Sequence, residues 1–114
     1  MTLSIAEVFT RHPGPRYTKQ GKGSGEEFRE SYLRPQFDAA VRNGERLLVD
    51  LDGVEFGYPT SFLEEAFGGL ARKCGIDAVQ KTLEFKSAAE PMLEEEIRYY
   101  IKNANRSGPF GDAD

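Results

Sequence analysis

Two short segments near the middle of this chain of 114 residues carry side chains suited to phosphate chemistry. Asp50 and Asp52 belong to the motif DLDG and directly follow the apolar residues 47–49, so both carboxylates are expected at the end of a strand. Thr60 and Ser61 lie where a helix is expected to begin, and a hydroxyl there can receive a phosphate. The acidic pair favours an enzyme, whereas the hydroxyl pair favours a protein that is itself modified.

The acidic pair resembles the nucleophile motif of haloacid dehalogenase-type phosphatases, in which the first Asp attacks phosphorus and the second acts as acid and base. Such an enzyme also needs a hydroxyl at a later strand end, a Lys for the phosphoryl oxygens and further acids for a Mg²⁺ site. The acidic groupings downstream of Asp52 lie on predicted helices or in the tail, and none follows an apolar strand. We therefore favour the alternative that Asp50 and Asp52 cap the turn made by Gly53.

The Gly-rich segment at 16–25, RYTKQGKGSG, is another candidate for phosphate binding. Backbone amides at a helix N-terminus suit anions, and Arg16, Tyr17, Lys19 and Lys22 could contact a ligand there. The spacing fits neither the phosphate-loop pattern GxxxxGK[ST] nor the dinucleotide pattern GxGxxG. A flexible loop before a capped helix explains the segment at least as well. A small nucleotide-binding or phosphatase-like enzyme that uses this loop with the acidic pair is the alternative function.

Composition excludes several classes of protein. The length suits one domain, and the 15 Lys and Arg residues are scattered in a chain of net charge −4, so nucleic acid is not an expected partner. A lone Cys, Cys74, and a lone His, His12, rule out an internal disulfide and most metal centres, and we expect neither a metal nor another cofactor. The sequence shows no membrane span and no signal peptide, which predicts a cytoplasmic protein without a membrane partner.

Hydrophobic periodicity predicts strands that alternate with helices. Strands are expected at 3–9, 46–51 and 82–85, with 16–25 as a further strand or a mobile loop. The run at 46–51 is apolar at successive positions, as in a parallel strand that is covered on both faces. The alternation indicates an α/β sandwich with a largely parallel or mixed sheet.

Three Ser-x-x-Glu capping boxes, at Ser24, Ser61 and Ser87, predict the helix starts. The first helix is expected to break at Pro35 and to stop at Asn43-Gly44. The middle helix, 61–74, is expected to pack on the sheet through Leu63, Phe67, Leu70, Ala71 and Cys74. We expect a single domain over residues 1–104 and a frayed tail over 105–114.

Two stretches, PGPRYTKQGKGSGEEFRESYLRP and VDLDGVEFGYPTSFLEEAFGGLAR, resemble a STAS-like family of unknown function found in bacteria and archaea. This family is related to the STAS domains of anti-sigma factor antagonists. The resemblance covers residues 3–104 and is most specific at GYPTSFLEEAFGGL. It implies a STAS-like α/β sandwich, with helices packed on a mixed sheet of about four strands, and a regulatory protein that is not an enzyme.

In the antagonists, a serine at the start of the corresponding helix is phosphorylated by a GHKL-fold kinase that is also the anti-sigma factor. The unphosphorylated form binds that kinase and frees the sigma factor. Carried over to this chain, the resemblance implies Ser61 or Thr60 as the phosphoacceptor. Antagonists usually have an acid before this residue, where Pro59 stands here. Ser61 with Glu64 also fits a purely structural capping box, and both roles stay open.

The flank of the middle helix is predicted to dock a GHKL-type ATPase or kinase. If the apolar stripe faces the sheet, Phe62, Ala66 and Gly69 line up on a more exposed side and form a shallow apolar groove. A phosphate beside the acidic residues of the first turns would make this site strongly negative. The predicted docking residues are Tyr58, Phe62, Glu64, Glu65, Ala66 and Gly69. The pair Gly68-Gly69 weakens a helix, which requires either a close backbone contact or tight packing on the sheet.

Overall fold

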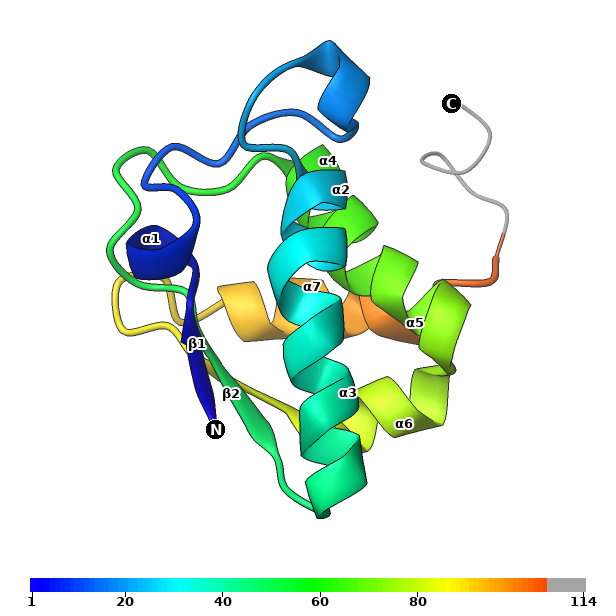
Figure 1. Ribbon diagram of the computed structural model, residues 1–114. Coiled ribbons are helices and arrows are strands. Elements are labelled where there is room, and N and C mark those ends of the chain that lie inside the picture. The colour runs from blue at the N-terminus through cyan, green and yellow to red at the C-terminus, as the bar shows by residue number, and fades with distance from the viewer. Residues whose placement is uncertain (107–114) are drawn as a thin grey trace.

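The computed structural model describes residues 1–106 and contains one parallel sheet. The sheet consists of β1 (Thr2–Ser4), β2 (Leu47–Asp50) and β3 (Leu83–Lys86) in that order (Figure 1). Both pairs of neighbouring strands are parallel. The α/β fold class is confirmed, but the prediction of about four strands in a mixed sheet is wrong, since the part of the chain described here forms three strands in one direction.

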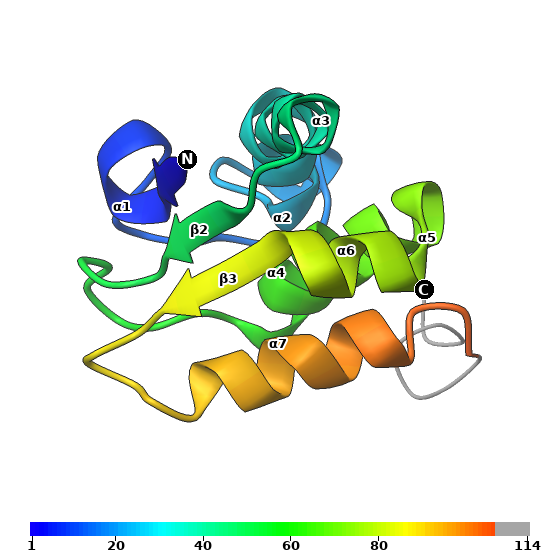
Figure 2. The ribbon, with the colours of Figure 1, turned by 90° about the horizontal axis from the view of Figure 1, so that it is seen from below.

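Two helical crossovers connect the strands. The first contains one continuous helix over 25–43, and the second contains a helix over 60–74 followed by α6 (Ile76–Thr82). Crossovers between parallel strands are right-handed, so two successive crossovers in the same direction place their helices on the same face. Figure 2 shows these helices on one side of the sheet. The last helix, α7 (Leu93–Lys102), packs against the 60–74 helix and α6.

The opposite face of the sheet is open, which corrects the prediction that both faces of the central strand are covered. Leu47 and Val49 are buried, whereas Leu48 between them is only partly buried. Cross-strand ion pairs cover part of this face. They are Arg46 with Glu84 at 3.2 Å and Lys86 with Asp50 at 3.7 Å. Charged pairs of this kind make an uncovered sheet face compatible with solvent.

The N-terminal strand is shorter than its alternating pattern predicts. It ends at Ser4, and α1 (Ile5–Val8) follows. The Ser4 side chain accepts a hydrogen bond from the Glu7 backbone N–H at 3.2 Å and so caps this short helix. The alternative strand at 16–25 is also absent from the described structure, where the segment is a loop with a 3₁₀ turn at Thr18–Gln20.

The helix over 25–43 begins as its capping box predicts. Ser24 accepts a hydrogen bond from the Glu27 N–H at 2.9 Å. The helix ends at Gly44, as expected, but the predicted break at Pro35 is wrong. A π-helical turn, Arg29–Leu33, lies between α2 (Gly25–Phe28) and α3 (Arg34–Asn43). This wider turn lets the helix pass a proline that cannot donate a backbone hydrogen bond.

The helix over 60–74 also contains a π-helical turn. Its parts are α4 (Thr60–Leu63), the turn Glu64–Gly68 and α5 (Gly69–Cys74). The buried stripe is confirmed at Leu63, Phe67, Leu70 and Ala71, while Cys74 is partly buried. The N-cap is Pro59, and no side chain caps this end, so the capping box predicted at Ser61 is wrong.

The third capping box is wrong as well. Helix α7 starts only at Leu93, and the Ser87 hydroxyl instead donates a hydrogen bond to the Glu90 carbonyl at 2.6 Å within a turn. Pro91 explains the delay, because a proline disfavours the helical conformation of the residue before it. Of the tail predicted at 105–114, residues 107–114 lie outside the described structure. No helix within residues 1–106 is long and apolar enough to cross a membrane.

Replacing Leu63 by Ala tests the packing of the 60–74 helix. Leu63 is fully buried, so its truncation is expected to lower the free energy of unfolding by about 2–5 kcal/mol in urea denaturation. Phe56 is 89% exposed, so Phe56→Ala is the control and should change stability by less than about 0.5 kcal/mol. A loss for Leu63→Ala no larger than the control's would contradict this packing.

Candidate functional site

The starts of the two long helices lie against each other. The rings of Phe28 and Phe62 are stacked with centroids 6.0 Å apart. A Cβ on Gly25 would lie 2.5 Å from the Phe62 carbonyl oxygen, so only glycine allows this approach. The loop at 13–23 crosses above this contact and contacts both helices (Figure 1).

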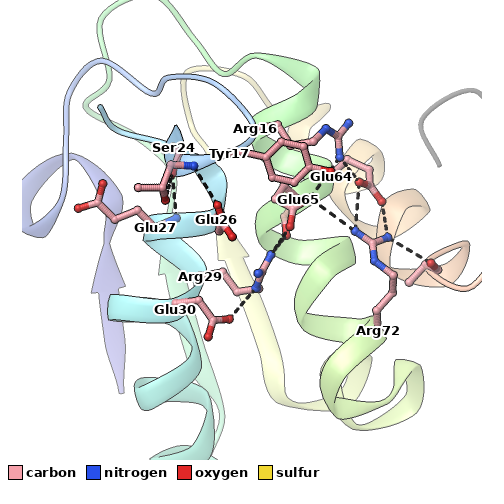
Figure 3. Close-up of polar contacts among 12 residues, drawn as sticks. Arg16, Tyr17, Ser24, Glu26, Glu27, Arg29, Glu30, Glu64, Glu65 and Arg72 are labelled. Atoms are coloured by element: carbon pink, nitrogen blue, oxygen red, sulfur yellow. Dashed lines mark hydrogen bonds and ion pairs between the residues drawn. The ribbon is translucent and has the colours of Figure 1, made fainter. Parts of the chain in front are cut away.

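Five charged side chains beneath the loop form an ionic cluster, defined as Arg16, Arg29, Glu64, Glu65 and Arg72 (Figure 3). Both carboxylates are on the π-helical turn of the 60–74 helix, and each residue is 8% exposed. Arg16 comes from the loop and Arg29 from the 25–43 helix. Arg72 lies two turns after the glutamates on the 60–74 helix. The cluster therefore connects three segments of the chain.

The ion pairs in this cluster are short. Arg16 Nη1 lies 2.6 Å from Glu64 Oε1, and Arg72 Nη1 lies 2.6 Å from Glu64 Oε2. Arg29 Nη1 lies 2.6 Å from Glu65 Oε2 and also donates to the Glu65 carbonyl at 2.8 Å. Each carboxylate is thus paired with at least one guanidinium group although the two are adjacent and buried.

The electrostatics of the cluster favour the charged forms. Burial by itself would raise the pKa of Glu64, but hydrogen bonds from Arg72 and Arg16 outweigh it and hold this pKa below its usual value. Burial would likewise lower the pKa of Arg29, yet hydrogen bonds to Glu65 and Glu30 raise it. Removal of one partner would leave a buried charge unpaired, which is strongly destabilising.

The cluster also explains the two adjacent helical glycines. A Cβ on Gly68 would lie 2.7 Å from Glu64 Oε2, and one on Gly69 would lie 2.5 Å from Arg29 Nη1. The space that side chains would need at these positions is filled by the ionic cluster. Neither a docking partner nor packing on the sheet is required to account for the glycine pair.

The Gly-rich loop does not form a phosphate cradle at the start of its helix. The N–H groups of Gly25 and Glu26 donate to the carbonyls of Pro15 and Arg16, at 2.9 Å and 3.0 Å, and Ser24 accepts from the third amide. These three donors are therefore occupied.

The four candidate ligand residues of this loop do not converge. Arg16 is buried in the ionic cluster, whereas Lys19 and Lys22 are exposed. Lys19 Nζ lies 5.7 Å from the centroid of the Tyr17 ring. The structure thus gives Arg16 a role in holding the loop and brings no anion site together from these side chains.

The two carboxylates at the end of β2 accept backbone hydrogen bonds, and the bond to Asp50 lies in the turn before Gly53, as the capping interpretation predicts. Asp50 Oδ1 accepts from the Asp52 N–H at 3.0 Å. The Asp52 carboxylate accepts from the N–H groups of Ala88 and Ala89, at 2.9 Å and 3.0 Å, which lowers its pKa. Among residues 1–106, no group of three or more His, Cys, Asp or Glu side chains is placed to hold a metal ion.

The predicted docking flank is not a surface, which corrects that expectation. Phe62, Ala66 and Gly69 are buried because the neighbouring 25–43 helix and α7 pack on the helix from two sides. Tyr58 is partly buried, and its hydroxyl donates to the Leu51 carbonyl at 2.8 Å. Glu64 and Glu65 are buried in the ionic cluster.

The hydroxyl pair is accessible. Thr60 is exposed and Ser61 is partly exposed, at the first and second positions of the helix. Sequence reasoning missed Arg29, Arg72 and the exposed ring of Phe56, and it assigned Arg16 to a ligand loop rather than to the ionic cluster. An available signal was the pairing of adjacent glutamates with adjacent glycines on one predicted helix face.

Residues 24–93 match the family described as STAS-like domain of unknown function (DUF4325). The chain belongs to this family. No curated protein and no solved structure shows significant similarity to it. The STAS-like match includes both long helices, so Arg29, Arg72 and the two buried glutamates lie inside it, while Arg16 lies before it.

The ionic cluster predicts a specific loss of stability in acid. Because the pKa of Glu64 is lowered in the folded state, its contribution is complete above the unfolded-state pKa of about 4.3 and is lost as the pH falls through the folded-state value. The free energy of unfolding of the wild type should therefore fall below about pH 5. Glu64→Gln keeps the shape but cannot titrate, so its stability should depend less steeply on pH.

Urea denaturation across this pH range measures the effect. Glu95→Gln replaces an exposed glutamate on α7 and serves as the control, with the wild-type pH dependence expected. The same slope in Glu64→Gln and in the wild type would show that the cluster does not respond to protonation of Glu64.

Proposed function

We propose that this STAS-like domain is a non-enzymatic regulatory module that binds a GHKL-type ATPase or kinase at the start of the 60–74 helix. Thr60 or Ser61 is the proposed phosphoacceptor. The observation that carries the proposal is the exposed hydroxyl pair in a helical turn that no side chain caps, one turn before the ionic cluster. A partner can therefore reach the hydroxyls without any opening of the fold.

The other candidate groups are already hydrogen-bonded within the protein, which supports a role without catalysis. Asp50 and Asp52 accept hydrogen bonds from backbone amides, and the first amides of the Gly-rich loop helix are occupied. A nucleophile or a phosphate cradle needs such groups to be available to substrate. Because the predicted flank is buried, we place the proposed contact surface at residues 58–61, which include Pro59 at the N-cap.

A phosphate on Thr60 would meet favourable charges. The first amides of the helix and its dipole attract an anion. Thr60 is also four residues before Glu64 and so on the same helix face, where Arg16 and Arg72 already pair with the Glu64 carboxylate. The added charge is compatible with the fold, and we propose that the partner, rather than the domain itself, responds to it.

Variants of the two hydroxyl residues test the switch. Since Ser61 is not the N-cap, Ser61→Ala and Ser61→Asp should each change the free energy of unfolding by less than about 0.5 kcal/mol. In calorimetry with the proposed GHKL-type kinase partner, Ser61→Ala should bind like the wild type. Ser61→Asp should bind at least tenfold more weakly, a loss of about 1.4 kcal/mol. Thr60→Ala and Thr60→Asp identify which hydroxyl is the acceptor.

The matched control is Ser31→Asp, which adds the same charge to an exposed serine on the neighbouring helix and should leave binding unchanged. Incubation with the kinase and ATP, followed by mass spectrometry, maps the phosphate. Equal affinity of all aspartate variants, with no phosphate on Thr60 or Ser61, would reject the proposed switch.

A nucleotide titration tests the absence of catalysis separately. A ligand at a hundredfold excess over its Kd stabilises a protein by about 2.7 kcal/mol, which a thermal melt detects. We expect no change in melting temperature with ATP and Mg²⁺. We also expect no hydrolysis of a phosphomonoester by the wild type, and hence no activity that Asp50→Asn could abolish. Hydrolysis that depends on Mg²⁺ and is lost in this variant would replace the proposed function with an enzyme.

A further inference from the structure

A cavity of about 250 Å³ lies at the carboxyl ends of β2 and β3, and none of the residues of the ionic cluster lines it. The segments after both strands leave the sheet at the same edge (Figure 2). Residues within 51–58 and 87–93 form the walls of the cavity. Ligands of α/β proteins bind at this edge of the sheet. The volume is below the roughly 300–1,000 Å³ of pockets for drug-sized ligands, which favours a single side chain over a cofactor.

The charge of the cavity is negative. Three acidic residues, Asp52, Glu55 and Glu90, line it, and within residues 1–106 no Lys or Arg does. Asp52 is held by two backbone amides, and Glu55 lies 3.9 Å from His12.

Glu90 differs from the other two acids. Its Oε1 lies 3.2 Å from the place that a Cβ on Gly57 would occupy, so its carboxylate reaches across to the opposite wall. The described structure gives this side chain no hydrogen bond and no ion pair. An unpaired carboxylate in an acidic cavity is complementary to a cation.

The other walls are apolar or aromatic and are fixed in position. Leu51, Val54 and Leu93 contribute apolar surface. The Tyr58 hydroxyl is anchored on the Leu51 carbonyl, and its pKa is raised, first by burial and then by the surrounding carboxylates. The ring therefore remains neutral and can contact a cation through its face.

Two large apolar side chains that are exposed stand next to lining residues in the chain. Phe56 is 89% exposed and sits in the chain between two lining residues, and Met92 is 69% exposed and directly precedes Leu93. Gly53 and Gly57, both with positive φ, bracket the loop that carries Phe56. Exposed aromatic and Met side chains around a charged recess are typical of protein-binding surfaces.

We propose that this cavity binds an arginine side chain of a partner protein, while Phe56 and Met92 contact apolar residues beside that arginine. A guanidinium can pair with a carboxylate through two parallel hydrogen bonds and stack on an aromatic ring, which fits Glu90 and Tyr58 better than an ammonium does. The preformed walls reduce the entropy lost on binding. This surface adjoins the contact surface at residues 58–61 and shares Tyr58 with it, but binding here does not depend on phosphorylation.

The probe is N-acetyl-arginine amide, titrated into ¹⁵N-labelled protein and followed by NMR. Saturable shifts are expected at the amides of Gly53, Gly57, Ala89 and Glu90. Glu90→Gln removes the charge at an exposed position and should weaken binding about tenfold. Glu95→Gln, an exposed glutamate outside the cavity, is the matched control and should bind like the wild type.

The neutral isostere N-acetyl-citrulline amide separates charge recognition from non-specific contact, and N-acetyl-lysine amide separates arginine from any cation. The peptide acetyl-Leu-Arg-Leu-amide should bind more tightly than the amino-acid derivative, with the gain lost in Phe56→Ala. The proposal would be overturned if the citrulline derivative caused the same shifts as the arginine derivative, or if the lysine derivative bound as tightly as the arginine derivative. Unchanged affinity of Glu90→Gln for the arginine derivative would also overturn it. So would shifts spread evenly over the surface.

Discussion

The fold around the candidate site depends on how two adjacent buried carboxylates are neutralised. Glu64 and Glu65 would be very costly to bury alone, because both charges would lose their water and repel each other. Three guanidinium groups from different parts of the chain remove this cost, with ion pairs as short as 2.6 Å. The loop at 13–23, the 25–43 helix and the 60–74 helix are thereby held in one arrangement.

This constraint also determines which residues surround the cluster. Gly68 and Gly69 weaken the helix locally, but larger residues there would displace the charged side chains. The hydroxyl pair at Thr60 and Ser61 thus sits on a helix whose next turn is fixed by ion pairs. A rigid frame below an exposed turn is well suited to recognition, since binding then requires little ordering.

Local sequence signals predicted what local physics decides. The Leu63, Phe67 and Leu70 stripe and the cap at Ser24 depend on residues a few positions apart, and the structure confirms both. The box at Ser61 failed because Glu64, its expected partner, is bound by an arginine 48 residues away in sequence. Likewise, periodicity showed that one side of this helix is buried, but not that two other helices cover its flank.

Each π-helical turn holds one more residue than an α-helical turn would, and this has a consequence for how the domain can change in evolution. Deletion of one residue from Arg29–Leu33 would restore an α-helical turn and leave Phe28 and Phe37, on either side of it, facing inward. In the second turn, Glu64–Gly68, the same deletion would keep Leu63 and Leu70 on the buried face but would remove a position from the segment that carries Glu64 and Glu65. Relatives that lack the first wide turn are thus expected to have a helix one residue shorter, whereas relatives that keep the ionic cluster are expected to keep the second turn.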